Sequence, residues 1–208
     1  MALISNGSTI FDNGSMASGF GGSMTFIKKL TASSSATLSF LDSTDGVVLD
    51  STYKEYVFTF NNIHPATEAA KFQFQGDTGT NTNYNQSITS TNFRTYHAES
   101  DAASGIGYIT GGDQANGTAF QNLSEDSQGA DADQSLCGTL KIFNPSSSVF
   151  VKHFIADTIT SKNSGGQIYA IDAYVSGYFN TTTALTRFQF KMDSGNIDAG
   201  DICLYGIA

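Results

Sequence analysis

Apolar and polar residues alternate in short segments from residue 24 to the end of the chain. In residues 53–60, for example, Tyr56, Phe58 and Phe60 fall on one face, and a period of two is typical of a half-buried β-strand. These segments are also rich in the aromatic and β-branched residues that favour strands. The pattern predicts nine or ten short strands, within residues 24–30, 36–41, 53–60, 72–75, 93–97, 136–143, 149–156, 168–179, 186–192 and 202–207.

Turn-forming residues separate these segments. Residues 42–46 (DSTDG) and 144–148 (NPSSS) contain the Asp, Asn, Ser, Pro and Gly that favour turns for steric or hydrogen-bonding reasons. No segment of ten or more residues has the 3.6-residue period of a helix, and no repeat of fixed length is present. Many short strands joined by turns indicate an all-β protein. We expect an antiparallel β-sandwich that is jelly-roll-like.

The expected organisation is a flexible or extended N-terminal arm at residues 1–23, followed by a single β-sandwich domain at residues 24–208. The arm is rich in Gly, Ser and Asn, which is typical of unpacked segments. Docking on a neighbouring subunit and an unstructured terminus are both compatible with this composition. Residues 98–135 are the least periodic part of the domain, and an internal loop of that length is usually functional or disordered.

Composition narrows the classes of partner. Charged residues make up 14% of the 208 residues and the net charge is −9. A surface with so few Lys and Arg disfavours nucleic acid as the partner, because binding to phosphates needs clusters of these cations. No apolar run has the length of a membrane-spanning helix. We therefore expect no nucleic-acid partner and no membrane partner.

The N-terminus has neither the basic region nor the apolar core of a secretory signal, so we expect no export by the general pathway. Cys137 and Cys203 are too few for a disulfide scaffold, and we interpret both as buried free thiols. A bridge between them would require neighbouring strands. We give no weight to the Asn-x-Ser/Thr sequences, which a chain this rich in Asn, Ser and Thr contains by chance. They are at Asn6, Asn13, Asn85, Asn116, Asn122 and Asn180.

None of the three histidines has the sequence spacing of a metal site. His64 precedes Pro65 in a turn-like context and His97 ends a short predicted strand. His153 alternates with aliphatic residues, so we interpret it as a core or interface residue. The motifs of serine hydrolases and of phosphate-binding loops are absent.

Acidic residues are frequent in the central segment, where paired carboxylates would suit a glycosidase or Ca²⁺. The chain has no Trp for sugar stacking, and the turn at residues 193–198 has its glycine in the wrong position for a Ca²⁺ loop. We therefore interpret these residues as solvated turns and assign no catalytic residue, no cofactor-binding residue and no metal ligand. The acidic residues of the central segment are Glu99, Asp101, Asp113, Glu125, Asp126, Asp131 and Asp133.

Several segments resemble structural proteins of tailed phages that infect marine bacteria. They are residues 53–67 (YKEYVFTFNNIHPAT), 143–147 (FNPSS) with 151–154 (VKHF), 177–182 (GYFNTT), and 188–197 (FQFKMDSGNI) with the ending 204–207 (LYGI). The resemblance covers roughly residues 24–208. It implies a component of the virion, assembled in the host cytoplasm, and does not imply an enzyme.

The expected function is therefore that of a non-enzymatic virion structural protein, a decoration or knob protein on the capsid surface. Its expected partners are copies of itself, as a trimer, and other virion proteins, foremost the major capsid protein. The first alternative is a tail-fibre or receptor-binding module that uses the loop at residues 98–135 to contact a host-surface receptor. The second alternative is a carbohydrate-acting enzyme that uses Glu99 and Asp101.

Overall fold

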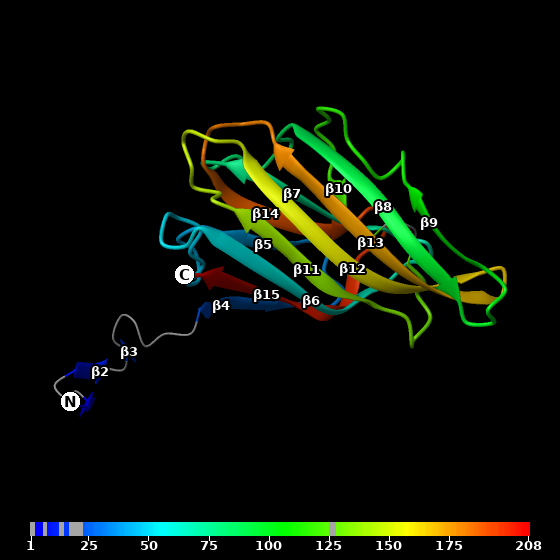
Figure 1. Cartoon of the computed structure of the whole chain (residues 1–208), viewed down its shortest axis with the longest axis horizontal. Coiled ribbons are helices and arrows are strands. Elements are labelled where there is room, and N and C mark those ends of the chain that lie inside the picture. The colour runs from blue at the N-terminus through cyan, green and yellow to red at the C-terminus, as the bar shows by residue number, and fades with distance from the viewer. Residues whose placement is uncertain (1–2, 6–7, 13–14, 17–22, 125–127) are drawn as a thin grey trace.

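The computed structural model describes residues 3–5, 8–12, 15–16, 23–124 and 128–208, and every regular element in these residues is a β-strand (Figure 1). In chain order the strands are β1 (Leu3–Ser5), β2 (Ser8–Asp12), β3 (Ser15–Met16), β4 (Met24–Thr31), β5 (Leu38–Leu41), β6 (Glu55–Pro65), β7 (Phe72–Thr78), β8 (Ile88–Ala98), β9 (Ser104–Tyr108), β10 (Gln121–Asn122), β11 (Leu136–Phe143), β12 (Lys152–Ser164), β13 (Gln167–Phe179), β14 (Leu185–Met192) and β15 (Ile197–Ile207).

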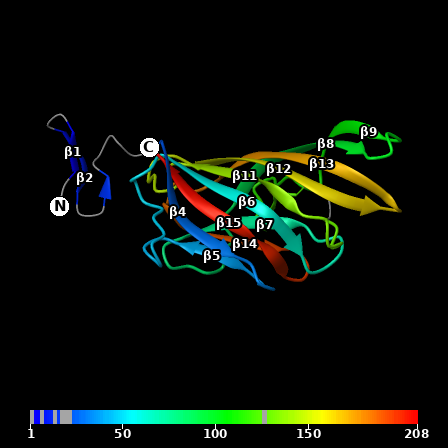
Figure 2. The ribbon, with the colours of Figure 1, turned by 90° about the horizontal axis from the view of Figure 1, so that it is seen from below.

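Two antiparallel sheets pack face to face (Figure 2). The small sheet has four strands in the order β10-β7-β14-β5, and the large sheet has eight in the order β4-β15-β6-β11-β12-β13-β8-β9. This arrangement confirms the predicted antiparallel β-sandwich. Strands β1, β2 and β3 form a separate three-stranded sheet, and residues 1–2, 6–7, 13–14 and 17–22 of the expected N-terminal arm lie outside the described residues.

The pairing of eight strands has the nested order of a jelly roll. Taken in chain order, these strands are β4, β5, β6, β7, β10, β11, β14 and β15. The first pairs with the eighth, the second with the seventh, the third with the sixth and the fourth with the fifth. Successive strands of this series alternate between the sheets, except that β7 and β10 pair within the small sheet. The sequence therefore folds as one long antiparallel ribbon rolled around a core.

Two insertions into this order enlarge only one sheet. Strands β8 and β9 come between the fourth and fifth strands, and β12 and β13 come between the sixth and seventh. They pair in the order β12-β13-β8-β9 and continue the large sheet beyond β11. We call these four strands the wing. In Figure 1 the wing extends past the small sheet on the right of the molecule.

The core between the sheets is aromatic. Phe190 of β14 is fully buried, and its ring lies 5.1 Å from that of Phe58 and 5.5 Å from that of Phe60 on the opposite sheet. On its own sheet it stacks on Phe72 at 5.9 Å. The edge-to-face contacts of Phe190 with Phe58 and Phe60 join the two sheets. Such aromatic pairs stabilise the sandwich by more than the burial of apolar area alone. This packing fixes which face of each strand points inward.

Glycines with a positive φ allow close approaches between strands of the large sheet at Gly138 and Gly200. Gly200 lies at a bulge in β15 with a φ of +116°, and an added Cβ would come within 2.5 Å of the Asn62 carbonyl oxygen. Gly138 of β11 has a φ of +156°, and its Cβ would come within 2.4 Å of a backbone oxygen of β12. Only glycine fits such positions without a shift of the neighbouring backbone.

The predicted strands differ from the observed ones at their ends and in the central segment. The strand expected at 149–156 begins three residues later, at Lys152, and continues to Ser164. Residues 98–135 contain β9 and β10, two strands that the aperiodic sequence did not indicate. The described part of the chain has no helix long and apolar enough to cross a membrane.

Candidate functional site

Two of the histidines lie at separate surface positions beside carboxylates. The His64 Nδ1 atom lies 3.7 Å from the Asp198 carboxylate, and its Nε2 atom lies 3.2 Å from the Asp131 carbonyl oxygen. His97 Nε2 lies 3.2 Å from the Asp101 carboxylate, on an exposed turn. The partners of His64 and His97 in these contacts are Asp residues, and no Ser or Cys side chain is among them.

His153 lies on the outer side of β12, where its side chain is exposed. Its ring lies 5.9 Å from that of Tyr178 on β13. The interpretation of His153 as a core residue is therefore wrong, because the alternation of β12 buries Lys152 and Phe154 and leaves His153 in solvent. An interface role stays a prediction.

The carboxylates that the sequence singles out are dispersed. Asp113 accepts a hydrogen bond from the Tyr108 hydroxyl at 2.6 Å, and Asp193 accepts one from the backbone N–H of Lys71 at 2.7 Å. Glu99 lines a shallow groove on the other side of the sheet from the core. Among the described residues, no three His, Cys, Asp or Glu side chains come together to hold a metal ion.

The remaining acidic residues of the central segment include one in a groove and two outside the described residues. Asp133 lines a polar groove beside His64 and Asp198. Glu125 and Asp126 lie outside the described residues, as do Asn6 and Asn13 of the Asn-x-Ser/Thr sequences.

Both cysteines are free thiols, as expected. Cys203 of β15 is buried, whereas Cys137 of β11 is only half-buried, so the prediction that both are buried is wrong for Cys137. Strand β6 lies between β11 and β15 in the large sheet. The two cysteines are therefore not on neighbouring strands.

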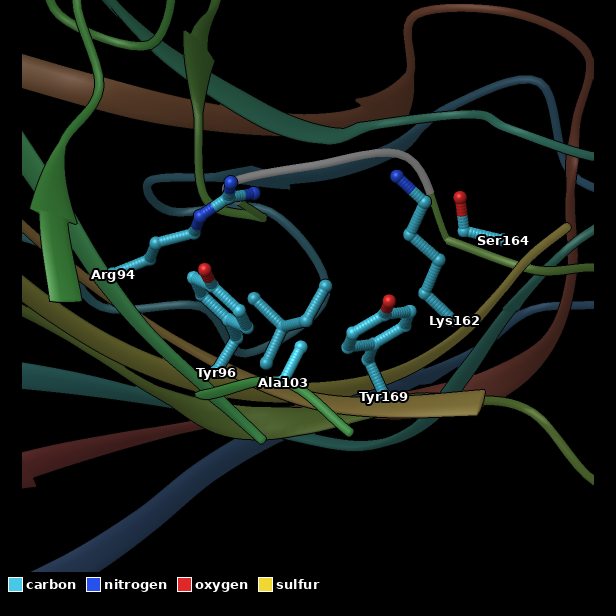
Figure 3. Close-up of a pocket in the computed structure, with 7 residues that line it drawn as sticks. Arg94, Tyr96, Ala103, Lys162, Ser164 and Tyr169 are labelled. Carbon is cyan, nitrogen blue, oxygen red and sulfur yellow. The ribbon is translucent and has the colours of Figure 1, made fainter. Parts of the chain in front are cut away.

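The most distinctive site is a pocket on the inner face of the wing, which we call the wing pocket (Figure 3). Its volume is about 260 Å³. The rings of Tyr96 and Tyr169 form its walls, and the cationic ends of Arg94 and Lys162 lie at its mouth on opposite sides. The remaining lining residues are Ala103, Ser164 and Ile171.

The register of three strands brings these side chains together. Tyr169 of β13 pairs with Lys162 of β12, and Ile171 pairs with Tyr96 of β8. Because side chains alternate between faces, Arg94 and Tyr96 point to the same side of β8. The pocket therefore combines residues of the β12-β13 hairpin with residues of β8, which lies far from that hairpin in the sequence.

The edge strand β9 contributes backbone in place of side chains at this site. Gly105 pairs with Tyr96, and a Cβ added at Gly105 would come within 3.0 Å of the Tyr96 ring carbon Cζ. The absence of a side chain at Gly105 thus lets the hydroxyl end of the Tyr96 ring lie close to β9. A side chain at this position would compete with the Tyr96 ring for the same space.

Two interactions organise the aromatic and cationic groups. The Arg94 guanidinium lies 5.1 Å from the centre of the Tyr96 ring, a geometry favourable for a cation–π contact. The rings of Tyr96 and Tyr169 are 6.2 Å apart and meet edge to face at 66°. None of the described residues that line the pocket is acidic.

A second feature lies on the opposite face of the wing, which we call the outer face. Here the rings of Phe93 and Tyr174 stack 4.9 Å apart with an interplanar angle of 15°. Phe93 pairs in register with Tyr108 on the edge strand. Further large apolar side chains of the outer face are exposed, at Ile106, Ile155 and Ile159.

Two carboxylates of the outer face interact across β12 and β13. The pKa of Asp157 is raised, first by partial burial, then by a hydrogen bond with Asp172 and by the charge of Asp172. Asp172 also accepts a hydrogen bond from Tyr174, which raises the pKa of that phenol. Asp157 therefore holds its proton more tightly than an isolated Asp does.

Sequence reasoning missed both the wing pocket and the outer face. The alternating residues 93–97 (FRTYH) show that aromatic and cationic side chains fall on defined faces of a strand, but the identity of the neighbouring strands depends on the fold. Comparison of the chain with protein-family models, with curated proteins and with solved structures gives no match. The functional argument therefore depends on the geometry of these two features and on the resemblance of the sequence segments.

Proposed function

We propose that this protein is a non-enzymatic structural component of a phage particle, where it decorates the capsid surface. The observation that supports this best is the cluster of exposed aromatic and aliphatic side chains on the outer face of the wing. Phe93, Tyr108 and Ile106 lie on paired strands there. Contiguous exposed apolar side chains of this kind mark surfaces that bind other proteins.

The charges of the outer face indicate the chemistry of its partner. The described outward-facing positions of β12, β13, β8 and β9 include Asp157 and Asp172 and no Lys or Arg. The complementary surface has apolar residues with Lys or Arg among them, because an acid pair that is buried against a neutral surface would be costly. We assign this surface to a shell subunit, the major capsid protein, and expect the protein to bind it as a homotrimer.

The test is the position and copy number of the protein in a reconstruction of the particle. A decoration protein is expected in hundreds of copies with the wing against the shell. A variant with Phe93→Ser and Ile106→Ser should fold but should be lost from purified particles. The matched control is Val149→Ser with Phe150→Ser, which removes exposed apolar side chains outside the wing. A dozen or two copies, located on the tail, would contradict the proposal.

The wing pocket favours a second candidate, a receptor-binding module of the tail. Tyr96, Tyr169 and Arg94 offer aromatic and charged groups to a small ligand, and these residues belong to strands β8 and β13 of the wing. Binding of the purified protein to host cells, together with a low copy number on the tail, would support this candidate over decoration.

A further inference from the structure

We infer that the wing pocket binds a single acidic sugar unit, that is, a pyranose ring with a carboxylate or sulfate substituent. The inference goes beyond decoration of the shell, since a glycan site can serve a protein on either the shell or the tail. It depends on the residues of the pocket alone, so it can be tested on the isolated protein.

The anionic substituent is matched by Arg94 and Lys162. A guanidinium offers two parallel N–H donors that fit a carboxylate or sulfate, and a lysine adds a second positive charge. Both side chains already have partners within the protein, so the anion joins or exchanges with existing interactions. The chain has a net charge of −9, and long-range attraction therefore does not favour an anion. Local contacts must provide the affinity.

The sugar ring is matched by the two tyrosines and by Ile171. The rings of Tyr96 and Tyr169 are 6.2 Å apart and meet at 66°, and the Ile171 side chain lines the same pocket. One apolar face of a pyranose can lie against such a wall, while the phenol groups and the Ser164 hydroxyl can exchange hydrogen bonds with sugar hydroxyls. A bare inorganic anion would leave these apolar walls in contact with water.

The size and position of the pocket agree with one sugar unit of a longer chain. Its volume of about 260 Å³ lies below the roughly 300 Å³ at which sites for drug-sized ligands begin. On β12 the inner face is covered as far as Thr158 and Thr160, whose hydroxyls donate to the carbonyl oxygens of Leu123 and Ser135. Beyond Thr160 the strand is more exposed, and Ser164 lies in solvent. A polysaccharide can therefore continue out of the site.

The test is a titration of the isotope-labelled protein followed by NMR. The probes are glucuronate, glucose 6-sulfate, glucose and sodium sulfate, at low and at high salt. We expect glucuronate or glucose 6-sulfate to shift the backbone signals of the three strands that line the pocket. The affinity for that sugar acid should be at least tenfold higher than for glucose or for sulfate, and it should fall as salt increases.

Three variants test the assignment to this pocket. Arg94→Gln and Lys162→Gln should each weaken binding of the sugar acid by tenfold or more, because each removes a charge-assisted contact. Tyr169→Ala should weaken it as well, by removing one wall. The matched controls are Lys54→Gln, an exposed cation elsewhere, and Tyr178→Ala, on the opposite face of β13. Both controls should bind as the native protein does.

Each result decides between the sugar acid and another ligand. Equal binding of sulfate and glucose 6-sulfate would overturn the inference in favour of a simple anion site. Equal binding of glucose and glucuronate would overturn it in favour of a neutral-sugar site. Absence of binding by all four probes would also overturn it. Backbone NMR spectra of the variants show whether each is folded, and the location of the protein in the particle is measured separately.

Discussion

Asp157 on β12 and Asp172 on β13 hydrogen-bond to each other on the outer face of the wing. A hydrogen bond between two carboxyl groups requires a proton on one of them, so Asp157 ionises less readily than an isolated Asp. The structure thus places a group that binds protons tightly in the middle of an exposed aromatic and aliphatic surface. Two consequences follow, for stability and for the pH dependence of stability.

We predict that Asp157→Asn stabilises the protein at pH 7. The folded-state pKa of Asp157 is raised, above the value of about 3.9 in an unfolded chain. The favourable contribution of this group is therefore present below about pH 4 and is lost as the pH rises through the folded-state pKa. Asp157 pairs with Tyr174 and Asp172 pairs with Ile159, so the two carboxylates are diagonal neighbours. Removing their repulsion should raise the melting temperature slightly. Thermal melts at several pH values measure it.

Asp201→Asn is the matched control for this prediction. The pKa of Asp201 is lowered, first by a hydrogen bond from Thr31 and then by one from Lys29. Its stabilising contribution is therefore present above the unfolded pKa and is lost as the pH falls through the folded-state value. Asp201→Asn should lower the melting temperature at pH 7, in the direction opposite to Asp157→Asn. A change of melting temperature in the same direction for both variants at pH 7 would contradict the raised pKa of Asp157 in the outer-face pair.

We predict that Phe190→Ala lowers the free energy of unfolding by about 3–5 kcal/mol, as is usual when a buried Phe is truncated in a packed core. The Phe190 side chain is fully buried and its ring packs between the two sheets, against Phe58 and Phe60. Urea unfolding measures the change. Phe150→Ala is the control: this side chain is 68% exposed, and a change within about 0.5 kcal/mol is expected. A similar loss in both variants would contradict a core centred on Phe190.

The strands that bury one face could be predicted from the sequence. The predicted segment 136–143 coincides with β11, and 168–179 differs from β13 by one residue. In these strands tertiary burial imposes the same period of two that the sequence shows. The jelly-roll order results from the pairing of strands far apart in the chain, such as β4 with β15.

The wing pocket could not be predicted from the sequence for a physical reason. The edge strand β9 contains Gly105 and Gly107 and exposes Ile106 and Tyr108, so it lacks the alternation of buried and exposed apolar residues. The pocket also requires the register that sets Tyr169 beside Lys162. A shift of one residue would turn Arg94 and Tyr96 to the outer face.

We predict that Gly200→Ala lowers the free energy of unfolding by roughly 1–3 kcal/mol. Gly200 has a φ of +116°, and an added Cβ would lie 2.8 Å from the Ile63 Cα atom of the adjacent strand. The backbone of β6 or β15 would have to move. Gly107→Ala is the control, because an added Cβ there meets no atom within 4 Å. Equal melting temperatures for the two variants would show that the bulge at Gly200 tolerates a side chain.

We predict that iodoacetamide modifies Cys137 at least ten times faster than Cys203 in the folded protein. Cys137 is half-buried and lines a groove on the surface of the large sheet, whereas Cys203 is 8% exposed. Reaction of a buried thiol must wait for local opening of the sheet. Mass spectrometry of quenched samples measures both rates. Cys137→Ser should remove the fast phase and leave the slow one, and both thiols should react at similar rates in urea. A fast phase that survives Cys137→Ser would place the accessible thiol on β15 instead.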